Sequence, residues 1–157
     1  MADTMRWRYG ETNPVLVPVD SGTVIEIGDL VYLDTDDAKP ASAQADQSSE
    51  AANQELFHDK CLGVAMQRSR TGDTEPIRIA TTGVFEFVCA SASFEVGDLM
   101  GGDEASNGTQ LEDQQVAKVA TANLAVGRCA HRVSPASTRV LVDIVSTVMR
   151  GGPQVAA

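Results

Sequence analysis

The side chains that could carry metal or nucleophilic chemistry in this sequence are two histidines and three cysteines. His58 precedes Cys61 by three positions, and Cys129 precedes His131 by two, at a matching point of the second half of the chain. Zinc accepts such ligands, but structural zinc sites have more regular spacings, and free cysteines most often pack as small hydrophobes. We therefore predict no metal site, and we expect Cys89 to belong to the core.

Other catalytic and cofactor chemistries lack their sequence patterns. No Gly-x-Ser-x-Gly elbow is present, and only two histidines could act as a general base. No Gly-Lys-Ser/Thr follows a glycine cluster, so a phosphate-binding loop is not indicated. Asp34, Asp36 and Asp37 lie close together without the glycine and terminal glutamate of a calcium loop. The sequence thus predicts no catalytic residue, no cofactor and no enzyme.

The charge balance narrows the classes of partner. Acidic residues outnumber basic ones by 22 to 12, giving a net charge of −10. Binding to nucleic acid requires clustered Lys and Arg side chains, so we expect no nucleic-acid partner. No apolar run is long enough to span a membrane, and residues 1–10 lack the apolar stretch of a secretory signal. We expect synthesis in the cytoplasm, no membrane contact and, with an odd number of cysteines, no disulfide framework.

Arg6, Trp7, Arg8 and Tyr9 combine two cations with two aromatics, a mixture enriched at protein interfaces. They lie in residues 1–14, which show no periodicity that would bury one face. We predict an extended N-terminal arm whose four side chains bind a protein partner or a neighbouring subunit. The alternative is an arm that folds back to cover an open end of its own barrel.

Short clusters of Val and Ile favour strands, because β-branched side chains pack well on a pleated surface. A polar stretch, residues 34–55, is predicted to be a loop that ends in one short helix, with Ser48 or Ser49 as its N-cap. The strands at 76–80 and 84–88 are predicted to form a hairpin, and residues 101–114 an exposed loop or loose hairpin. The other predicted strands are 15–19, 24–27, 30–33, 62–66, 116–119, 126–130 and 140–148.

The chain contains an internal repeat. Residues 26–31, EIGDLV, recur as residues 95–100, EVGDLM, and a short glycine-containing segment and an alternating strand follow each copy. Two such units, each too short to bury its own face, should pair into a single barrel or sandwich. The predicted fold is therefore mainly β, a β-barrel or β-sandwich of two pseudo-repeated halves.

The repeated Gly-Asp pairs have a structural interpretation. Gly28 and Gly97 are expected to adopt positive φ or a bulge, while Asp29 and Asp98 bond neighbouring amides in the turn. The domain organisation that follows is an arm at 1–14, a β-rich domain at 15–150 and a flexible C-terminal tail at 151–157.

The order of these features resembles the decoration, or cement, proteins of tailed bacteriophages. The resemblance covers about residues 22–146 and depends on the Glu-x-Gly-Asp-Leu turn, the Ala-rich insert that ends in residues 57–65, the TGVFEF segment at 82–87 and the second Gly-Asp turn. It implies a β-rich protein that binds the outside of an assembled capsid, often as trimers, and resists the pressure of packaged DNA. The implied partners are the major capsid protein and further copies of the chain.

A second class of function remains open from the sequence. A β-barrel on a virion head could instead recognise a glycan or a host surface. Such a module requires a concave pocket lined with aromatic side chains, and aromatics make up 4% of this chain.

Overall fold

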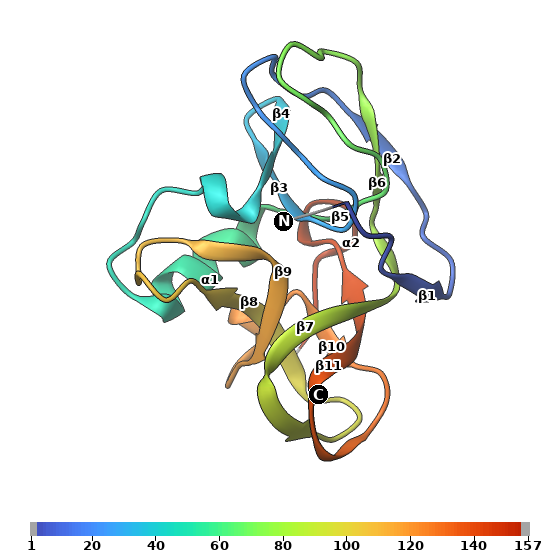
Figure 1. Cartoon of the computed structure of the whole chain (residues 1–157), viewed down its shortest axis with the longest axis vertical. Helices are drawn as coiled ribbons and strands as arrows, with labels where there is room; N and C mark the ends of the chain where they lie inside the picture. The colour runs from blue at the N-terminus through green and yellow to red at the C-terminus, as the bar shows by residue number, and fades with distance from the viewer. Residues whose placement is uncertain (1–2, 155–157) are drawn as a thin grey trace.

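The computed structural model describes residues 3–154 and shows two β-lobes, one from each half of the chain (Figure 1). The strands are β1 (Trp7–Tyr9), β2 (Val15–Val17), β3 (Leu30–Asp34), β4 (Asp37–Pro40), β5 (Cys61–Ala65), β6 (Ile77–Ala80), β7 (Thr82–Phe94), β8 (Leu99–Glu104), β9 (Leu111–Lys118), β10 (Gly127–Cys129) and β11 (Val133–Val145). The helices are α1 (Glu50–Lys60) and α2 (Thr147–Arg150), with 3-10 turns at Ala41–Ala43 and Ala122–Leu124.

The second half of the chain forms a closed barrel. Its strands follow the order β7-β11-β10-β8-β9, and β9 returns to β7 through a parallel pairing of Val88 with Gln115. The longest ladder joins β7 to β11, which are antiparallel. The predicted mainly-β fold with a barrel is confirmed.

The first half repeats the same strand order without a full closing ladder. Its sheet runs β2-β6-β5-β3-β4, which matches β7-β11-β10-β8-β9 strand for strand. The Ala38 amide of β4 donates to the carbonyl of Pro18, just after β2, at 2.9 Å. That single bond lies where the β7–β9 pairing closes the second half. The repeat in the sequence is therefore a repeat of the whole five-strand unit.

The two halves do not pair into the single barrel or sandwich that the repeat predicts. Each half forms its own sheet, because the polar stretch at 34–55 contributes β4. The composition of β4 does not indicate a strand. The side chains inside the first sheet form a separate core cluster: Val17, Val19, Ile25, Val31, Ala38, Leu62, Ala65, Ile77 and Ile79. The larger cluster fills the second barrel and extends to Leu30, Tyr32, Phe57 and Val64 of the first half.

Two glycines allow the neighbouring strands of each sheet to approach closely. A Cβ at Gly63 in β5 would lie 1.8 Å from the carbonyl oxygen of Ala80 in β6. A Cβ at Gly127 in β10 would lie 2.2 Å from the carbonyl oxygen of Asp143 in β11. These glycines occupy the same place in the repeat, and no larger residue fits there without moving backbone.

The predicted hairpin of 76–80 with 84–88 is wrong. β6 pairs with β2 and β5 in the first sheet, whereas β7 pairs with β1, β11 and β9 in the second. The chain crosses from one lobe to the other between them, so a turn signal marks the lobe boundary. The strand expected at 24–27 is reduced to one isolated bridge between Ile25 and Ser69.

The short helix is confirmed. α1 begins after Ser49, whose hydroxyl accepts a hydrogen bond from the Ala52 amide at 3.2 Å. Phe57 on this helix is buried and meets Tyr32 of β3 edge to face, with ring centroids 6.0 Å apart. The helix thereby ties the connection between β4 and β5 to the core.

The C-terminal segment packs against the domain over its described part. Gly152 and Pro153 are buried, and the carbonyl of Gln154 accepts a hydrogen bond from Arg128. These contacts lie in residues 151–154 of the tail predicted at 151–157, and the rest of it lies outside the described residues. Across residues 3–154, no helix is long and apolar enough to cross a membrane.

Candidate interaction surface

The N-terminal arm folds back onto its own barrel. In β1, Trp7 pairs with Phe85 and Tyr9 with Val84, both in β7. The arm thus pairs with β7 of its own barrel, and binding of a partner by its four side chains stays a prediction. β1 is the last strand of its sheet, so its outer edge has no neighbouring strand within residues 3–154.

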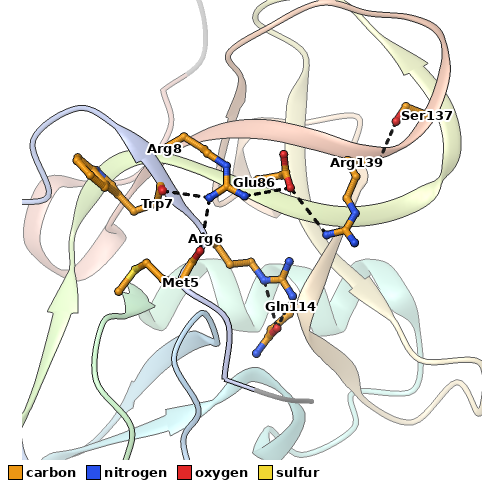
Figure 2. A network of polar contacts seen from close by, with 8 residues as sticks. All are labelled: Met5, Arg6, Trp7, Arg8, Glu86, Gln114, Ser137 and Arg139. Atoms are coloured by element: carbon orange, nitrogen blue, oxygen red, sulfur yellow. Dashed lines mark hydrogen bonds and ion pairs between the residues drawn. The ribbon is translucent and has the colours of Figure 1, made fainter.

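Arg6 points inward rather than toward a partner. Its guanidinium donates from Nε and Nη2 to Oε1 of Gln114, at 3.2 and 2.5 Å (Figure 2). The Gln114 amide, fully buried on β9, donates in turn to Oδ1 of Asp29 at 2.8 Å. This chain of contacts joins the arm, the second barrel and the first Gly-Asp turn. Burial lowers the pKa of Arg6 and raises the pKa of Asp29 to about 6.

Arg8 points outward and joins a charged cluster on the barrel surface. Its Nη2 lies 3.2 Å from a carboxylate oxygen of Glu86 on β7, and Nη1 of Arg139 on β11 lies 3.8 Å from the same oxygen (Figure 2). All three side chains are partly exposed, so the ion pairs contribute little to folding. The cluster holds Arg8 in place while leaving its guanidinium accessible.

Three exposed hydrophobic side chains are close to Arg8 in the sequence of the arm. Trp7 is 42% exposed and Tyr9 50%, and Met5 is also exposed. The Trp7 indole donates from Nε1 to the carbonyl of Gly10 at 2.9 Å, which fixes the ring without covering it. We call Met5, Trp7, Arg8 and Tyr9 the arm face.

The Gly-Asp turns have the geometry that the sequence predicts. Gly28 and Gly97 have φ of +98° and +92°. The Asp29 carboxylate accepts from the Glu26 amide at 2.9 Å, and the Asp98 carboxylate accepts from the Glu95 amide at 3.0 Å. The aspartates bond the backbone of their own turns, as a structural role requires.

The three cysteines are buried, and His58 and Cys129 contact backbone carbonyls. His58 Nδ1 is 2.7 Å from the carbonyl of Ala125, and the Cys129 thiol contacts the carbonyl of His131 at 3.2 Å. Cys61 is buried, which raises the pKa of its thiol to about 12. Within residues 3–154, no three His, Cys, Asp or Glu side chains are grouped in a way that could hold a metal ion.

Two of the surface hollows give no specific support to a glycan pocket. One hollow of about 300 Å³ has no aromatic side chain in its lining, which consists of Gln67, Arg68, Ser69, Asp73, Glu75, Pro76 and Ile77. A second, of about 220 Å³, contains one aromatic, Tyr32, beside charged groups. Ligand pockets are lined mainly by hydrophobic and aromatic side chains, and the exposed aromatics Trp7 and Tyr9 lie on the arm instead.

A comparison with protein families matches residues 47–144 to the model described as phage cement protein. The chain belongs to the phage cement protein family. The matched segment begins just before α1 and ends in β11, so it includes almost all of the cement-protein barrel and omits the arm and the first Gly-Asp turn. No curated protein matches the chain.

Sequence reasoning missed the residues that hold the arm. Glu86 and Arg139 occupy outward positions of alternating strands, and this pattern indicates only a solvent-facing side chain. Gln114 lies in a polar stretch whose sequence predicts a loop or loose hairpin, and no local signal marks it as buried. Their pairing with Arg6 and Arg8 depends on strands far apart in this cement protein's sequence.

Proposed function

We propose that this protein binds the outer surface of an assembled phage capsid, through the major capsid protein, and stabilises the shell against internal pressure. Membership of the cement protein family carries the proposal. The proposed location is the capsid exterior, after synthesis in the host cytoplasm. The role is structural and involves no catalytic step.

The arm face is the proposed contact with the capsid. Trp, Tyr and Arg dominate interface energies when they reach a pocket on a partner, and Trp7, Arg8 and Tyr9 are exposed together on one strand. The strand is already ordered by β7, so docking costs less conformational entropy than docking of a free arm. The free edge of β1 could also accept main-chain hydrogen bonds from an extended segment of the capsid.

Stabilisation then follows from mass action. A protein that binds the assembled shell and not its separated subunits adds a free energy that grows with the ratio of its concentration to its dissociation constant. Copies that contact more than one capsid subunit would oppose their separation. The family resemblance supports self-association as a homotrimer, and sedimentation equilibrium of the purified protein tests that prediction.

Co-sedimentation with undecorated heads tests the proposed function directly. Wild-type protein should pellet with the heads and raise the temperature at which they release DNA. The double variant Trp7→Ala/Tyr9→Ala should bind at least about tenfold more weakly, since interface anchors contribute on the order of 2 kcal/mol each. Its melting temperature should stay close to wild type because both side chains are half exposed.

Leu16→Ala is the matched control. Leu16 is an exposed apolar side chain on β2, another edge strand outside the arm face, and its loss should leave head binding unchanged. Absence of wild-type binding to undecorated heads would refute the function. Equal binding by the double variant and wild type would refute the arm face as the contact.

A further inference from the structure

The two Gly-Asp turns have the same backbone framework. The Gly28 amide donates to the carbonyl of Ala65, and the Gly97 amide donates to the carbonyl of Cys129, both at 2.9 Å. An arginine follows three residues after each acceptor, Arg68 in the first half and Arg132 in the second. Each turn therefore presents the same set of donors and acceptors beside an arginine.

The first turn is occupied by the start of the arm. The Thr4 amide donates to the carbonyl of Ile27 at 3.0 Å, and the Ile27 amide donates to Oδ1 of Asp3 at 2.8 Å. The other oxygen of Asp3 lies 3.0 Å from Nη1 of Arg68. The bound element is thus a short extended segment with a carboxylate held between a backbone amide and an arginine.

The second turn is open. A Cβ at Gly97 would have no atom within 4 Å, whereas one at Gly28 would lie 2.4 Å from the carbonyl oxygen of Thr4. Val96, which corresponds to Ile27, is 68% exposed, and its amide and carbonyl have no hydrogen-bond partner among the described residues. Within residues 3–154, the guanidinium of Arg132 bonds the exposed carboxylate of Glu95, at 3.1 Å.

Exposure differs along almost the whole repeat. Gly28, Asp29 and Leu30 are buried, whereas their counterparts at 97–99 are only partly buried. The second copy keeps the sequence EVGD and the αL glycine of the first without the segment that covers it. The backbone amide and carbonyl of Val96 are therefore available to pair with an extended segment through main-chain hydrogen bonds.

We propose that the turn at 95–98, with Arg132, binds an extended acidic segment of the phage shell in the way that the turn at 26–29 binds Asp3 and Thr4. The inference rests on the proposed function for the source of the segment. An Asp or Glu side chain would accept from the Val96 amide and from Arg132, and the next residue would donate to the Val96 carbonyl. Displacing Glu95 from Arg132 is inexpensive because both side chains are mostly exposed.

The number of arms favours the shell over a second copy as the source of this segment. Within the described residues, the arm segment at 3–6 already lies on the Gly28 turn of its own chain. A second copy therefore has no free arm to offer. An acidic segment of the shell subunit is consistent with the proposed capsid contact and adds a second attachment point away from the arm face.

A peptide titration tests the site without any capsid. The probe is a tetrapeptide blocked at both ends with the sequence of residues 3–6, Asp-Thr-Met-Arg, added to the full chain labelled for amide NMR. We expect saturable shifts at residues 96–98 and little change at 27–29, where the chain's own arm is present at high effective concentration. Replacing Asp with Asn in the peptide, or Arg132→Ala in the protein, should weaken binding about tenfold through loss of charge-assisted hydrogen bonds.

The absence of shifts at residues 96–98, or equal binding by the Asn peptide, overturns the proposal. Co-sedimentation with heads then tests the source of the segment. Arg132→Ala should weaken head binding, while Arg78→Ala, an exposed arginine on β6, should not. Unchanged head binding by Arg132→Ala also overturns the proposal.

Two results separate this proposal from its alternatives. If Arg132→Ala breaks up an oligomer before heads are added, the turn binds a second copy and the shell assignment is wrong. If wild-type protein fails to bind heads while the peptide shifts residues 96–98, the proposed function fails and the docking site remains.

Discussion

Asp29 and Asp98 occupy the same position in the two copies of the turn, but their pKa values are shifted in opposite directions. Each accepts the amide three residues before it, yet Asp29 is only 2% exposed, and burial raises its pKa to about 6. Asp98 is more accessible: the Glu95 amide and the neighbouring Lys118 lower its pKa. The turn geometry is local, whereas the charge environment depends on what tertiary structure places over it.

The backbone framework that the two halves share can be disrupted at Gly63 in β5 and Gly127 in β10. Gly63→Ala or Gly127→Ala should destabilise the protein by about 3 kcal/mol or more, because each new Cβ would overlap a backbone carbonyl oxygen of the adjacent strand. Gly22→Ala is the control, since a Cβ there has no atom within 4 Å. Urea denaturation measures all three, and a loss below 1 kcal/mol at either position would contradict the close approach.

The pH dependence of stability should distinguish the two aspartates. A raised pKa means that folded protein binds more protons, so the contribution of Asp29 is complete below about pH 4 and is lost as pH rises through about 6. The change amounts to up to ~3 kcal/mol, from a shift of about two units. For Asp98 the sign is reversed: its contribution is present above the ordinary pKa and is lost as pH falls.

Free energies of unfolding between pH 4 and 7.5 test this difference. Asp29→Asn should remove the loss of stability near pH 6, and Asp98→Asn should leave that loss in place. A wild-type pH profile for Asp29→Asn would show that Asp29 does not titrate near pH 6.

Substitutions of Gly28 and Gly97, which both have positive φ, measure the contact between the arm and the first turn. Gly97→Ala should cost about 1 kcal/mol from positive φ alone, and Gly28→Ala about 3 kcal/mol, because its Cβ would also meet the arm. Removing residues 2–6 should reduce the Gly28→Ala penalty to that of Gly97→Ala in a double-mutant cycle. Equal penalties in the full chain would show that the arm does not lie on the turn in solution.

The smallest effect is expected at the outer contacts of the arm. Glu86→Gln removes the ion pairs to Arg8 and Arg139 and should cost no more than ~0.5 kcal/mol, since the charges are partly exposed. Gln114→Ala provides the contrast, because it leaves the buried Arg6 and Asp29 without their shared partner. Thermal melts should rank the Gln114 variant well below the Glu86 variant.

Prediction from sequence succeeded where the signal is local. The Ser49 cap, the strands at 30–33 and 62–66 and the positive φ of Gly28 each depend on a few adjacent residues. It failed where distant residues decide the outcome. β4 has the composition of a loop, and it forms a strand because β3 supplies its partners.

For the interaction surface, the sequence indicated which residue types matter and not which of them are accessible. Arg6 and Arg8 are chemically identical and two positions apart, and one is buried against Gln114 while the other faces outward. Alternation would put them on the same side of an ideal strand, but Arg6 precedes β1, and the register of β1 on β7 is irregular between Trp7 and Tyr9. Their different exposures therefore could not be read from spacing alone.

By itself, the sequence determined the repeat, the turn chemistry and the β-rich character, because glycine φ preferences, Asp side-chain bonds and β-branched packing act within a few residues. Only the tertiary structure decided that each half builds its own sheet, that the arm covers one turn and leaves its copy open, and that Asp29 is buried while Asp98 is not. These outcomes depend on which distant segments come into contact. Hydrophobic burial and desolvation depend on closeness in space and not on separation along the chain.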